Sequence, residues 1–245
     1  MRTICGLRMA LNGVGNVTSV ELFEETGLLI GQKESAATSK ELEELQERTK
    51  NNPELFKLAC PAPSVNELIE WNTWLTPSTY KQRYMTSFFL VQMEGEPEVR
   101  MCEKEMSHYS WSDPKDCLQR ALVGEVILPP PQVYELTRIA QTPLEKVHLH
   151  GNTAHIFCPQ LIYWPDGNKI TNVLPGDHLY IDEDSFNQPA RELPVEEVQI
   201  KSHEPTHRQE YKSKPLYAFC KVFMYNLPEK YSNTLHQFET NPSKL

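Results

Sequence analysis

The most informative stretch of this chain lies at residues 21–28, where the sequence reads Glu21-Leu22-Phe23-Glu24-Glu25-Thr26-Gly27-Leu28. On a helix, Glu21, Glu24 and Glu25 have the spacing i, i+3, i+4, which places their side chains on one face. Three carboxylates on one face repel one another unless a cation lies between them, and such oxygen ligands suit Mg²⁺ or Mn²⁺. The alternative is a solvated acidic face, since glutamate-rich exposed helices are common. The stretch therefore predicts a helix that is either a metal site or an exposed acidic surface.

The sequence also marks the two ends of this helix. Gly27 suits the position just after a helix, where the backbone turns left-handed. Thr18 and Glu21 have the spacing of a capping box, which predicts that the helix starts at Thr18. Val20 lies directly before the first glutamate.

Composition restricts the class of protein. The 245 residues allow one large domain or two small ones. The net charge of −9 argues against a nucleic-acid partner, because a phosphate backbone favours a basic stripe. No apolar run approaches the roughly 18 to 20 residues that would cross a bilayer, so no membrane span is expected. The six cysteines are scattered without a C-x-x-C pair, which predicts free thiols.

Hydrophobic periodicity and turn residues predict an α+β chain. A hairpin is expected around Pro165-Asp166-Gly167-Asn168, because Asp-Gly pairs suit tight turns. The predicted organisation is a helix-flanked mixed sheet to about residue 150, followed by a β-rich extension. The expected helices are 39–50, 53–58, 65–71, 114–122 and 132–140, and the expected strands are 84–93, 106–111, 161–164, 170–173, 195–202 and 216–225, with a charged loop at 202–214.

Further motifs follow the octapeptide in a specific order. They are Trp74-Leu75-Thr76-Pro77, Tyr109-Ser110-Trp111-Ser112, Leu128-Pro129-Pro130-Pro131-Gln132 and Leu174-Pro175-Gly176-Asp177. Together with the octapeptide, which matches the second half of the Nudix signature, this order resembles the peroxisomal acyl-coenzyme A diphosphatases of the Nudix hydrolase family. The resemblance runs from about residue 2 to about residue 225. It implies an α/β/α sandwich with a mixed sheet.

The resemblance also implies an activity. Nudix enzymes use divalent metal ions to direct water onto a phosphorus atom of a diphosphate. For this branch of the family, the implied reaction cleaves coenzyme A and acyl-coenzyme A to adenosine 3′,5′-bisphosphate and (acyl)phosphopantetheine, with Mg²⁺ or Mn²⁺ as cofactor. Coenzyme A esters are therefore the expected small-molecule substrates.

Individual residues acquire roles by the same resemblance. Glu24 and Glu25 match the metal-binding pair, and Glu21 matches the glutamate that helps to hold metal or activated water. Glu105 is a candidate for a further ligand or a general base, against the alternative of a surface glutamate.

Two basic residues and one acidic residue are weighed separately. Lys81 and Arg83 are candidates for contacts with substrate phosphates, which arginine can bind through two hydrogen bonds, although exposed charges at strand edges are commoner. Asp177 follows a Pro-Gly pair and is expected to be a turn residue rather than a catalyst.

The chain departs from the family pattern in several places. Residues 9–20 are interpreted as an insertion, the alternative being a second register without one. In the insertion register Arg8 matches the family's arginine, and in the alternative register Val20 takes its place. In either register Val20 directly precedes Glu21, and Met85 stands where the family has an aspartate. The family's first strands fall upstream of Met1, which predicts a domain that is incomplete at the N-terminus. Two alternative functions follow: a catalytically impaired truncated isoform or remnant with weak nucleotide binding, and a Nudix hydrolase of another peroxisomal dinucleotide.

The expected domains follow from the same comparison. They are a partial Nudix hydrolase domain at 1–150, a β-rich extension packed on it at 151–228, and a flexible tail at 229–245.

The last three residues, Ser243-Lys244-Leu245, form the peroxisomal import tripeptide, which the import receptor reads as an address. We expect the last dozen residues to carry a fluorescent reporter into peroxisomes, because the flank of the tripeptide is polar and contains a helix breaker. Imaging of the fusion checks this, and a diffuse cytosolic signal would contradict it.

Overall fold

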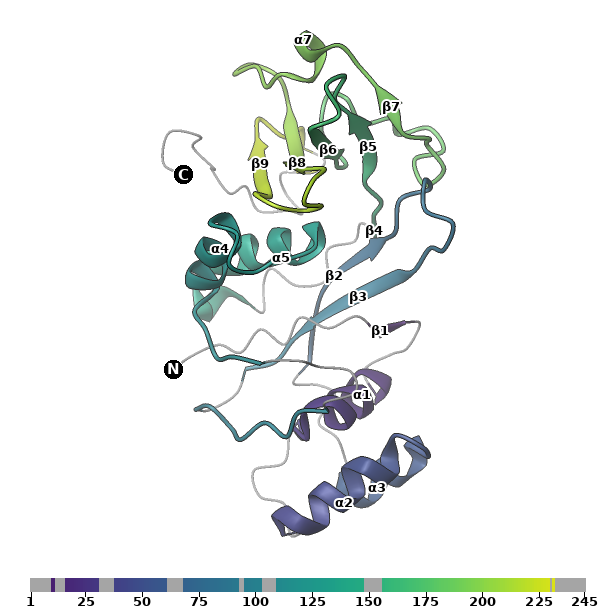
Figure 1. Ribbon diagram of the computed structural model, residues 1–245, viewed down its shortest axis with the longest axis vertical. Helices are drawn as coiled ribbons and strands as arrows, with labels where there is room; N and C mark the ends of the chain where they lie inside the picture. Colours follow the sequence, from purple (N-terminus) through teal and green to yellow (C-terminus); the bar gives the residue numbers. More distant parts are fainter. Residues whose placement is uncertain are drawn as a thin grey trace. The chain divides into compact units, whose positions relative to one another are not determined.

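The computed structural model describes residues 10–11, 16–30, 38–60, 68–92, 95–102, 109–147, 156–229 and 231. Helices and mixed sheets occur along the chain, which confirms the α+β class (Figure 1). The elements are β1 (Ala10–Leu11), α1 (Asn16–Thr26), α2 (Ser39–Thr49), η1 (Pro53–Leu55), α3 (Phe56–Ala59), β2 (Ile69–Leu75), β3 (Met85–Leu90), α4 (Pro114–Leu122), α5 (Pro130–Gln141), η3 (Leu144–Lys146), β4 (Ile156–Phe157), β5 (Gln160–Tyr163), β6 (Lys169–Val173), β7 (Arg191–Glu192), α7 (Val195–Val198), β8 (Thr206–Lys212) and β9 (Lys221–Tyr225).

The chain divides into two compact units. Unit one is drawn from residues 1–71 and 87–112, and unit two from residues 72–86 and 113–245. A four-stranded sheet has the order β1-β3-β2-β4, and a five-stranded sheet has the order β7-β5-β6-β8-β9. The domain boundaries expected from the sequence stay a prediction.

Unit one is held by a hydrophobic cluster that joins α1 to α2 and α3. The rings of Phe23 and Phe56 lie 5.7 Å apart, and both side chains are buried. Val20 packs against the same cluster from the preceding turn of α1. The start of α2 is fixed by a capping box, in which Thr38 and Glu41 each accept a hydrogen bond from the backbone N–H of the other.

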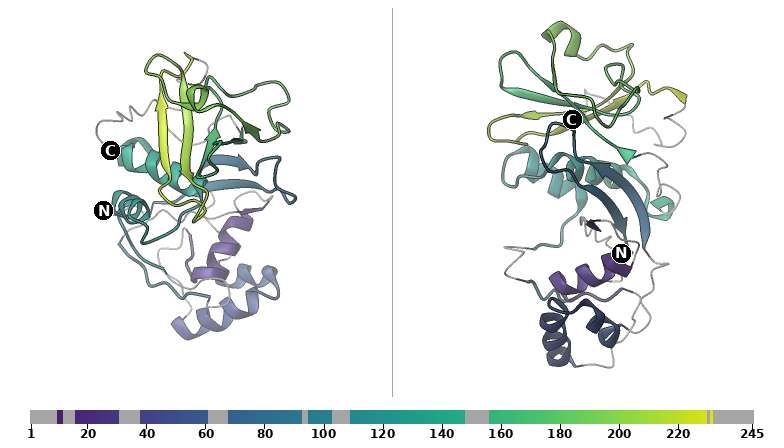
Figure 2. Two further views of the ribbon diagram at one scale, coloured as in Figure 1. Left: turned by 45° about the horizontal axis from the view of Figure 1, so that its top comes forward. Right: turned by 90° about the vertical axis from the view of Figure 1, so that its right-hand side faces the viewer.

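Unit two contains the five-stranded sheet. β5 and β6 are antiparallel, with Leu161 opposite Asn172, which confirms the predicted hairpin. On one face of the sheet, α5 packs against β8 and β9, and α4 lies beside α5 (Figure 2). On the other face, Val198 of α7 joins the buried residues Ile162 and Val173.

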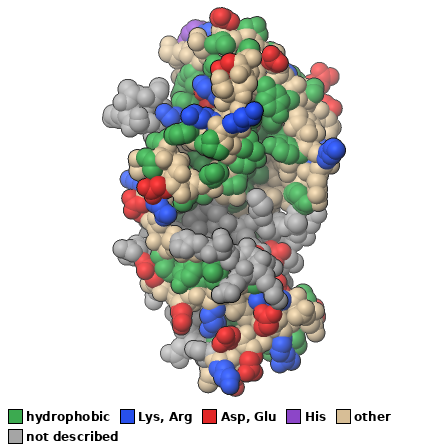
Figure 3. Space-filling view, viewed as in Figure 1, with side chains coloured by type: hydrophobic (Ala, Val, Ile, Leu, Met, Phe, Trp, Pro, Cys, Tyr) green, Lys and Arg blue, Asp and Glu red, His purple; other side chains and the backbone are tan. Residues whose placement is uncertain are grey.

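The surface over this sheet is chemically mixed. Figure 3 shows hydrophobic side chains there with Lys and Arg side chains among them. None of the helices in the described part of the chain is long and apolar enough to cross a bilayer. The cysteines of the described residues are free thiols: Cys60, Cys102, Cys117, Cys158 and Cys220.

Four local predictions differ from the structure. A helix at 65–71 was expected, but strand β2 starts at Ile69, and its Trp74 donates to the buried Glu135 carboxylate at 2.6 Å. A strand at 195–202 was expected, but α7 forms after Pro194. The charged loop expected at 202–214 contains strand β8, and the strand expected at 216–225 begins only at Lys221.

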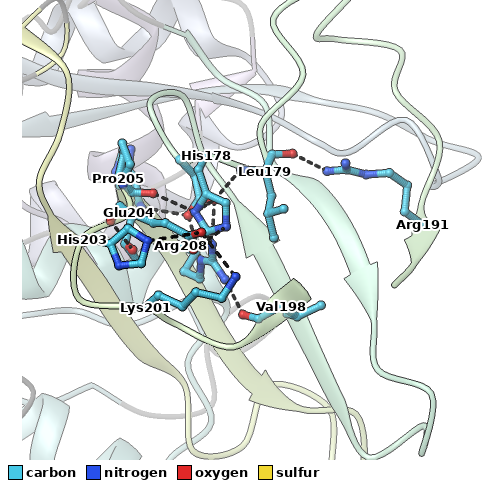
Figure 4. A network of polar contacts seen from close by, with 12 residues as sticks. His178, Leu179, Arg191, Val198, Lys201, His203, Glu204, Pro205 and Arg208 are labelled. Atoms are coloured by element: carbon cyan, nitrogen blue, oxygen red, sulfur yellow. Dashed lines mark hydrogen bonds and ion pairs between the residues drawn. The ribbon is translucent and has the colours of Figure 1, made fainter. Parts of the chain in front are cut away.

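β8 can include charged residues because one of them has a buried partner. The Arg208 guanidinium donates to both carboxylate oxygens of Asp177 at 2.7 Å, and both side chains are fully buried. Arg208 also donates to the carbonyl of Val198 at 2.7 Å (Figure 4). Asp177 is a turn residue as predicted, since one carboxylate oxygen accepts from the Leu179 N–H at 2.9 Å.

A polar group beside this ion pair is also buried. His207 Nδ1 lies 2.7 Å from the Pro175 carbonyl, so Nδ1 carries the proton. His207 Nε2 then accepts a hydrogen bond from the Tyr134 hydroxyl at 2.7 Å. Burial lowers the pKa of His207 to about 4, so the ring stays neutral at neutral pH.

We expect Asp177→Asn to lower the free energy of unfolding by about 3 kcal/mol or more, because it leaves the buried Arg208 charge without a carboxylate. The matched control is Glu125→Gln, which removes a partner of Arg120 from a pair whose side chains are 41% and 62% exposed. The control should change stability by less than about 0.5 kcal/mol. Urea unfolding followed by circular dichroism measures both, and equal losses would contradict the assignment.

Candidate functional site

The three glutamates lie where helix α1 leaves the hydrophobic cluster. Glu21, Glu24 and Glu25 are all half-buried and share one face of the helix, next to the apolar stripe of Val20 and Phe23. One carboxylate oxygen of Glu21 and one of Glu24 are fully buried. The carboxylates are therefore held at the edge of a packed unit rather than on a fully solvated face.

The start of α1 differs from the prediction. The helix begins at Asn16, so Thr18 lies inside the first turn and the predicted capping box at Thr18 is wrong. Residues 16–20 of the expected insertion thus extend the helix that bears the glutamates. Val20, which directly precedes Glu21, packs against the hydrophobic cluster.

The end of α1 agrees with the prediction. Gly27 has φ of +70°, in the left-handed region, and its N–H donates to the Phe23 carbonyl at 2.8 Å. Thr26 reinforces the turn, because its hydroxyl accepts from the Leu28 N–H at 3.2 Å. A Cβ atom at residue 27 would lie 2.9 Å from Nε of Arg100, so a second constraint also requires glycine here.

Hydrogen-bond donors from two other segments bind the carbonyl groups of residues 24–27, at the C-terminal end of α1. Arg100 donates its backbone N–H to the carbonyl of residue 26 at 2.8 Å and its guanidinium to that of residue 27 at 3.2 Å. The Cys102 N–H donates to the carbonyl of residue 25 at 2.8 Å. The buried Gln46 amide donates to the carbonyl of residue 24 at 3.1 Å and to that of Arg100 at 2.9 Å. These contacts fix the backbone that carries Glu24 and Glu25.

The charge of Arg100 also suits its position. A cation at the C-terminus of a helix is favoured by the helix dipole, by about 0.3–1 kcal/mol at exposed sites. Sequence reasoning missed Gln46, Arg100 and Cys102, because a donor to a backbone carbonyl leaves no spacing pattern in the sequence. The glutamates themselves were found from their spacing.

The chemistry of this face fits a divalent cation. Mg²⁺ is commonly bound by one or two protein carboxylates, with water and substrate phosphate completing the octahedron. Among the residues that the structure describes, no group of three or more His, Cys, Asp or Glu side chains is placed to hold a metal ion by itself. The glutamate face therefore supplies carboxylates of the kind that Mg²⁺ binds, without a closed group of ligands among these residues.

The basic candidates lie in unit two. Lys81 is exposed. Arg83 donates from Nε to the Thr76 carbonyl at 2.8 Å and from Nη2 to the Phe186 carbonyl at 2.6 Å. Its guanidinium thus holds two loops together, and a contact with substrate phosphates stays a prediction for both residues.

Arg83 also lies beside a buried thiol. Its Nη2 is 3.6 Å from Sγ of Cys158. Burial raises the pKa of Cys158 and outweighs the opposing effect of the guanidinium, so the group is a thiol rather than a thiolate.

Other candidates lie outside the described residues. Glu105 falls between residues 103 and 108, and Ser243, Lys244 and Leu245 fall in the segment after residue 231. Their roles stay predictions.

Two motifs of the sequence, at 128–132 and 174–177, are connected in unit two by hydrogen bonds of residues outside both motifs. The proline-rich motif at 128–132 leads into α5, and Tyr134 of α5 donates to His207. His207 in turn donates to the carbonyl of Pro175 in the motif at 174–177. Gln209 also donates to the Pro130 carbonyl. The two motifs therefore fix how α5 packs on the five-stranded sheet.

Comparisons with known proteins agree with this architecture. The family model of the NUDT19 Nudix domain matches residues 16–139. A Caenorhabditis elegans protein that carries the name nudix hydrolase 7 is 37% identical over 228 residues, covering 92% of this chain and 77% of its own length. No solved structure matches the chain.

Several relatives carry the name acyl-coenzyme A diphosphatase NUDT19. The Homo sapiens protein is 30% identical over 216 residues, which is 77% of this chain and 56% of that protein. The Xenopus laevis protein is 30% identical over 189 residues, which is 65% of this chain and 49% of that protein. The chain thus spans about half the length of these two relatives.

We expect Gly27→Ala to destabilise the protein by more than Gly124→Ala. Both glycines have positive φ, +70° and +82°, so alanine is strained at either position. Only Gly27 has a neighbour, since a Cβ atom at Gly124 would meet nothing within 4 Å. The difference in free energy of unfolding between the two variants, measured with urea, therefore reports the contact with Arg100. Equal destabilisation would contradict that contact.

Proposed function

Because the chain belongs to the Nudix hydrolase family, we propose that it is a metal-dependent diphosphatase that hydrolyses coenzyme A and acyl-coenzyme A. The products would be adenosine 3′,5′-bisphosphate and (acyl)phosphopantetheine. The observation that carries the proposal is the face of α1 with its three half-buried glutamates, on a helix whose final carbonyls are held by Gln46, Arg100 and Cys102.

Each glutamate has a proposed role. Glu24 and Glu25 hold a divalent cation, Mg²⁺ or Mn²⁺, and Glu21 orients the attacking water. When bound, such a cation neutralises phosphate oxygens and lowers the pKa of water. The chain itself would hold these carboxylates close together on a backbone that is fixed in place. No rearrangement of the helix would then be needed when a diphosphate binds. Glu105 is proposed as a further ligand or general base.

The substrate is proposed from the relatives. The human and Xenopus proteins are named acyl-coenzyme A diphosphatases, and they share 30% identity with this chain. The Ser-Lys-Leu tripeptide at the end of the sequence supports the same assignment. We propose a peroxisomal location from it, with the import receptor as a partner. Lys81 and Arg83 are proposed phosphate contacts.

One observation favours the alternative of an impaired enzyme. Val20 precedes Glu21 and packs against the hydrophobic cluster of Phe23 and Phe56, so this position offers no positive charge to the glutamate face. In that case the chain would bind nucleotide weakly without turnover. The proposal of a diphosphatase is preferred because all three glutamates are present.

We expect Glu25→Gln to lower the rate of coenzyme A hydrolysis by about 100- to 1,000-fold, because a neutral amide removes charge from a cation ligand. This corresponds to about 2.7–4 kcal/mol, the loss typical of one transition-state contact. The matched control is Glu43→Gln, an exposed glutamate on α2 of the same unit. Release of adenosine 3′,5′-bisphosphate at saturating Mg²⁺ or Mn²⁺ is the assay for both.

A second measurement separates binding from turnover. Titration calorimetry with Mn²⁺ should show weaker binding for Glu25→Gln than for Glu43→Gln. A rate for Glu25→Gln above about a tenth of the parent rate would reject Glu25 as a ligand. If the parent chain is folded and cleaves nicotinamide dinucleotides but not coenzyme A, the substrate assignment fails and the diphosphatase stands. If it cleaves neither, the remnant interpretation holds.

A further inference from the structure

The connection between β8 and β9, residues 212–221, presents two large apolar side chains to solvent. Leu216 is 44% exposed and Phe219 is 41% exposed. The backbone of the connection is unusual, because Tyr217 and Phe219 have φ of +69° and +56°. Aromatic residues rarely adopt this left-handed conformation, and strain of this kind persists where the surrounding structure enforces it.

The enforcing contacts are visible on the inner side of the connection. The Tyr217 ring packs edge-on against the buried Tyr211, with centroids 5.4 Å apart. Ala218 is buried, and its carbonyl accepts from the Lys212 N–H at 2.8 Å. The Ser213 N–H donates to the Asn168 carbonyl at 3.0 Å. Tyr217 and Ala218 thus point inward, and Leu216 and Phe219 are left outside.

Lysines accompany these two side chains in the sequence and in the sheet. Lys212, Lys214 and Lys221 are exposed and lie within the connection, and Lys169 lies directly opposite Lys212 in the sheet. Two like charges placed opposite each other across a sheet destabilise it. The pairing therefore brings two positive charges to this end of the sheet.

The two opposed ammonium groups rest on aromatic rings. Lys169 Nζ lies 4.0 Å from the centroid of Trp164, and Lys212 Nζ lies 4.2 Å from that of Phe219. Lys169 also pairs with Glu210 at 3.1 Å. The acidic side chains beside the four lysines are Glu210 and, in the neighbouring turn, Asp166. This end of unit two is therefore basic, although the net charge of the chain is −9.

We propose that residues 212–221 form a docking surface for an anionic lipid membrane. Leu216 and Phe219 would enter the boundary between headgroups and acyl chains, and the four lysines would contact lipid phosphates. Apolar side chains flanked by lysines are the combination that binds such interfaces. The net charge of −9 means that the rest of the chain is acidic, so charge favours an approach to an anionic surface through this end. This inference does not depend on the proposed enzymatic activity.

A second copy of the chain fits this surface less well. An isologous contact would place the same patch on both sides, and each patch brings four lysines. Like charges facing each other across an interface oppose association. Charge complementarity therefore favours lipid phosphate as the occupant.

The experiment is co-sedimentation with vesicles of phosphatidylcholine alone and with vesicles that also contain phosphatidylserine. We expect binding to the second kind, weakened by salt as the Debye length falls from about 10 Å at 0.1 M to about 3 Å at 1 M. Replacing Leu216 and Phe219 together by Ser should weaken binding at least tenfold. Lys212→Gln and Lys214→Gln should each weaken it about fivefold, which corresponds to about 1 kcal/mol per lysine.

Matched controls lie elsewhere in unit two. Val123 and Ile127 are 56% and 57% exposed, and their double replacement by Ser should leave binding unchanged. Lys115→Gln, at an exposed position on α4, controls for the loss of one charge. Near-ultraviolet dichroism of each variant establishes that it is folded.

Several results would overturn the proposal. They are equal binding to both kinds of vesicle, absence of binding, and equal losses in the control variants. If light scattering shows that the Leu216 and Phe219 variant turns a dimer into a monomer, the surface belongs to a second copy. If soluble glycerophosphoserine at headgroup concentration competes fully, the lysines bind free phosphate rather than a membrane. Because hydrolysis of coenzyme A is not measured, failure here leaves the proposed function untouched.

Discussion

A helix that ends inside a packed unit leaves its last carbonyl groups without intrahelical donors, and α1 ends in this way. Leaving one such carbonyl buried and unpaired costs about 1–3 kcal/mol. Gln46 and Arg100, which lie 22 and 73 residues away from their partners Glu24 and Gly27, supply donors. The position of the glutamate face therefore depends on hydrogen bonds to the backbone of α1. These bonds come from segments that contribute no residue to the glutamate face.

The parts of the fold that could be predicted are those whose signals are local. The helix α2, the hairpin of β5 and β6, and the left-handed Gly27 all follow from short patterns, and the structure confirms them. β8 could not be predicted, because a strand with a buried Arg208 is only possible once Asp177, 31 residues earlier, is folded against it. β2 was missed for the same kind of reason, since Trp74 depends on Glu135 of α5.

The candidate site shows the same division between local and distant signals. Carboxylate spacing identifies Glu21, Glu24 and Glu25 without any structure, because helix geometry alone places them together. The supporting donors had no sequence signal, since any backbone N–H, side-chain amide or guanidinium can donate to a carbonyl. The proline-rich and Leu-Pro-Gly-Asp motifs carried the family resemblance. In the structure they serve packing, because His207 hydrogen-bonds both to Tyr134 of α5 and to the Pro175 carbonyl.

The net charge of −9 connects the proposed chemistry to the metal. A diphosphate that approaches an acidic chain and three neighbouring carboxylates is repelled unless cations lie between them, because like charges close together cost several kcal/mol at low dielectric. Cation and substrate should therefore each raise the affinity of the site for the other, by the same factor, since binding linkage is reciprocal. Under the proposed function, one or two glutamates would hold the cation and the phosphates of the substrate would complete its coordination.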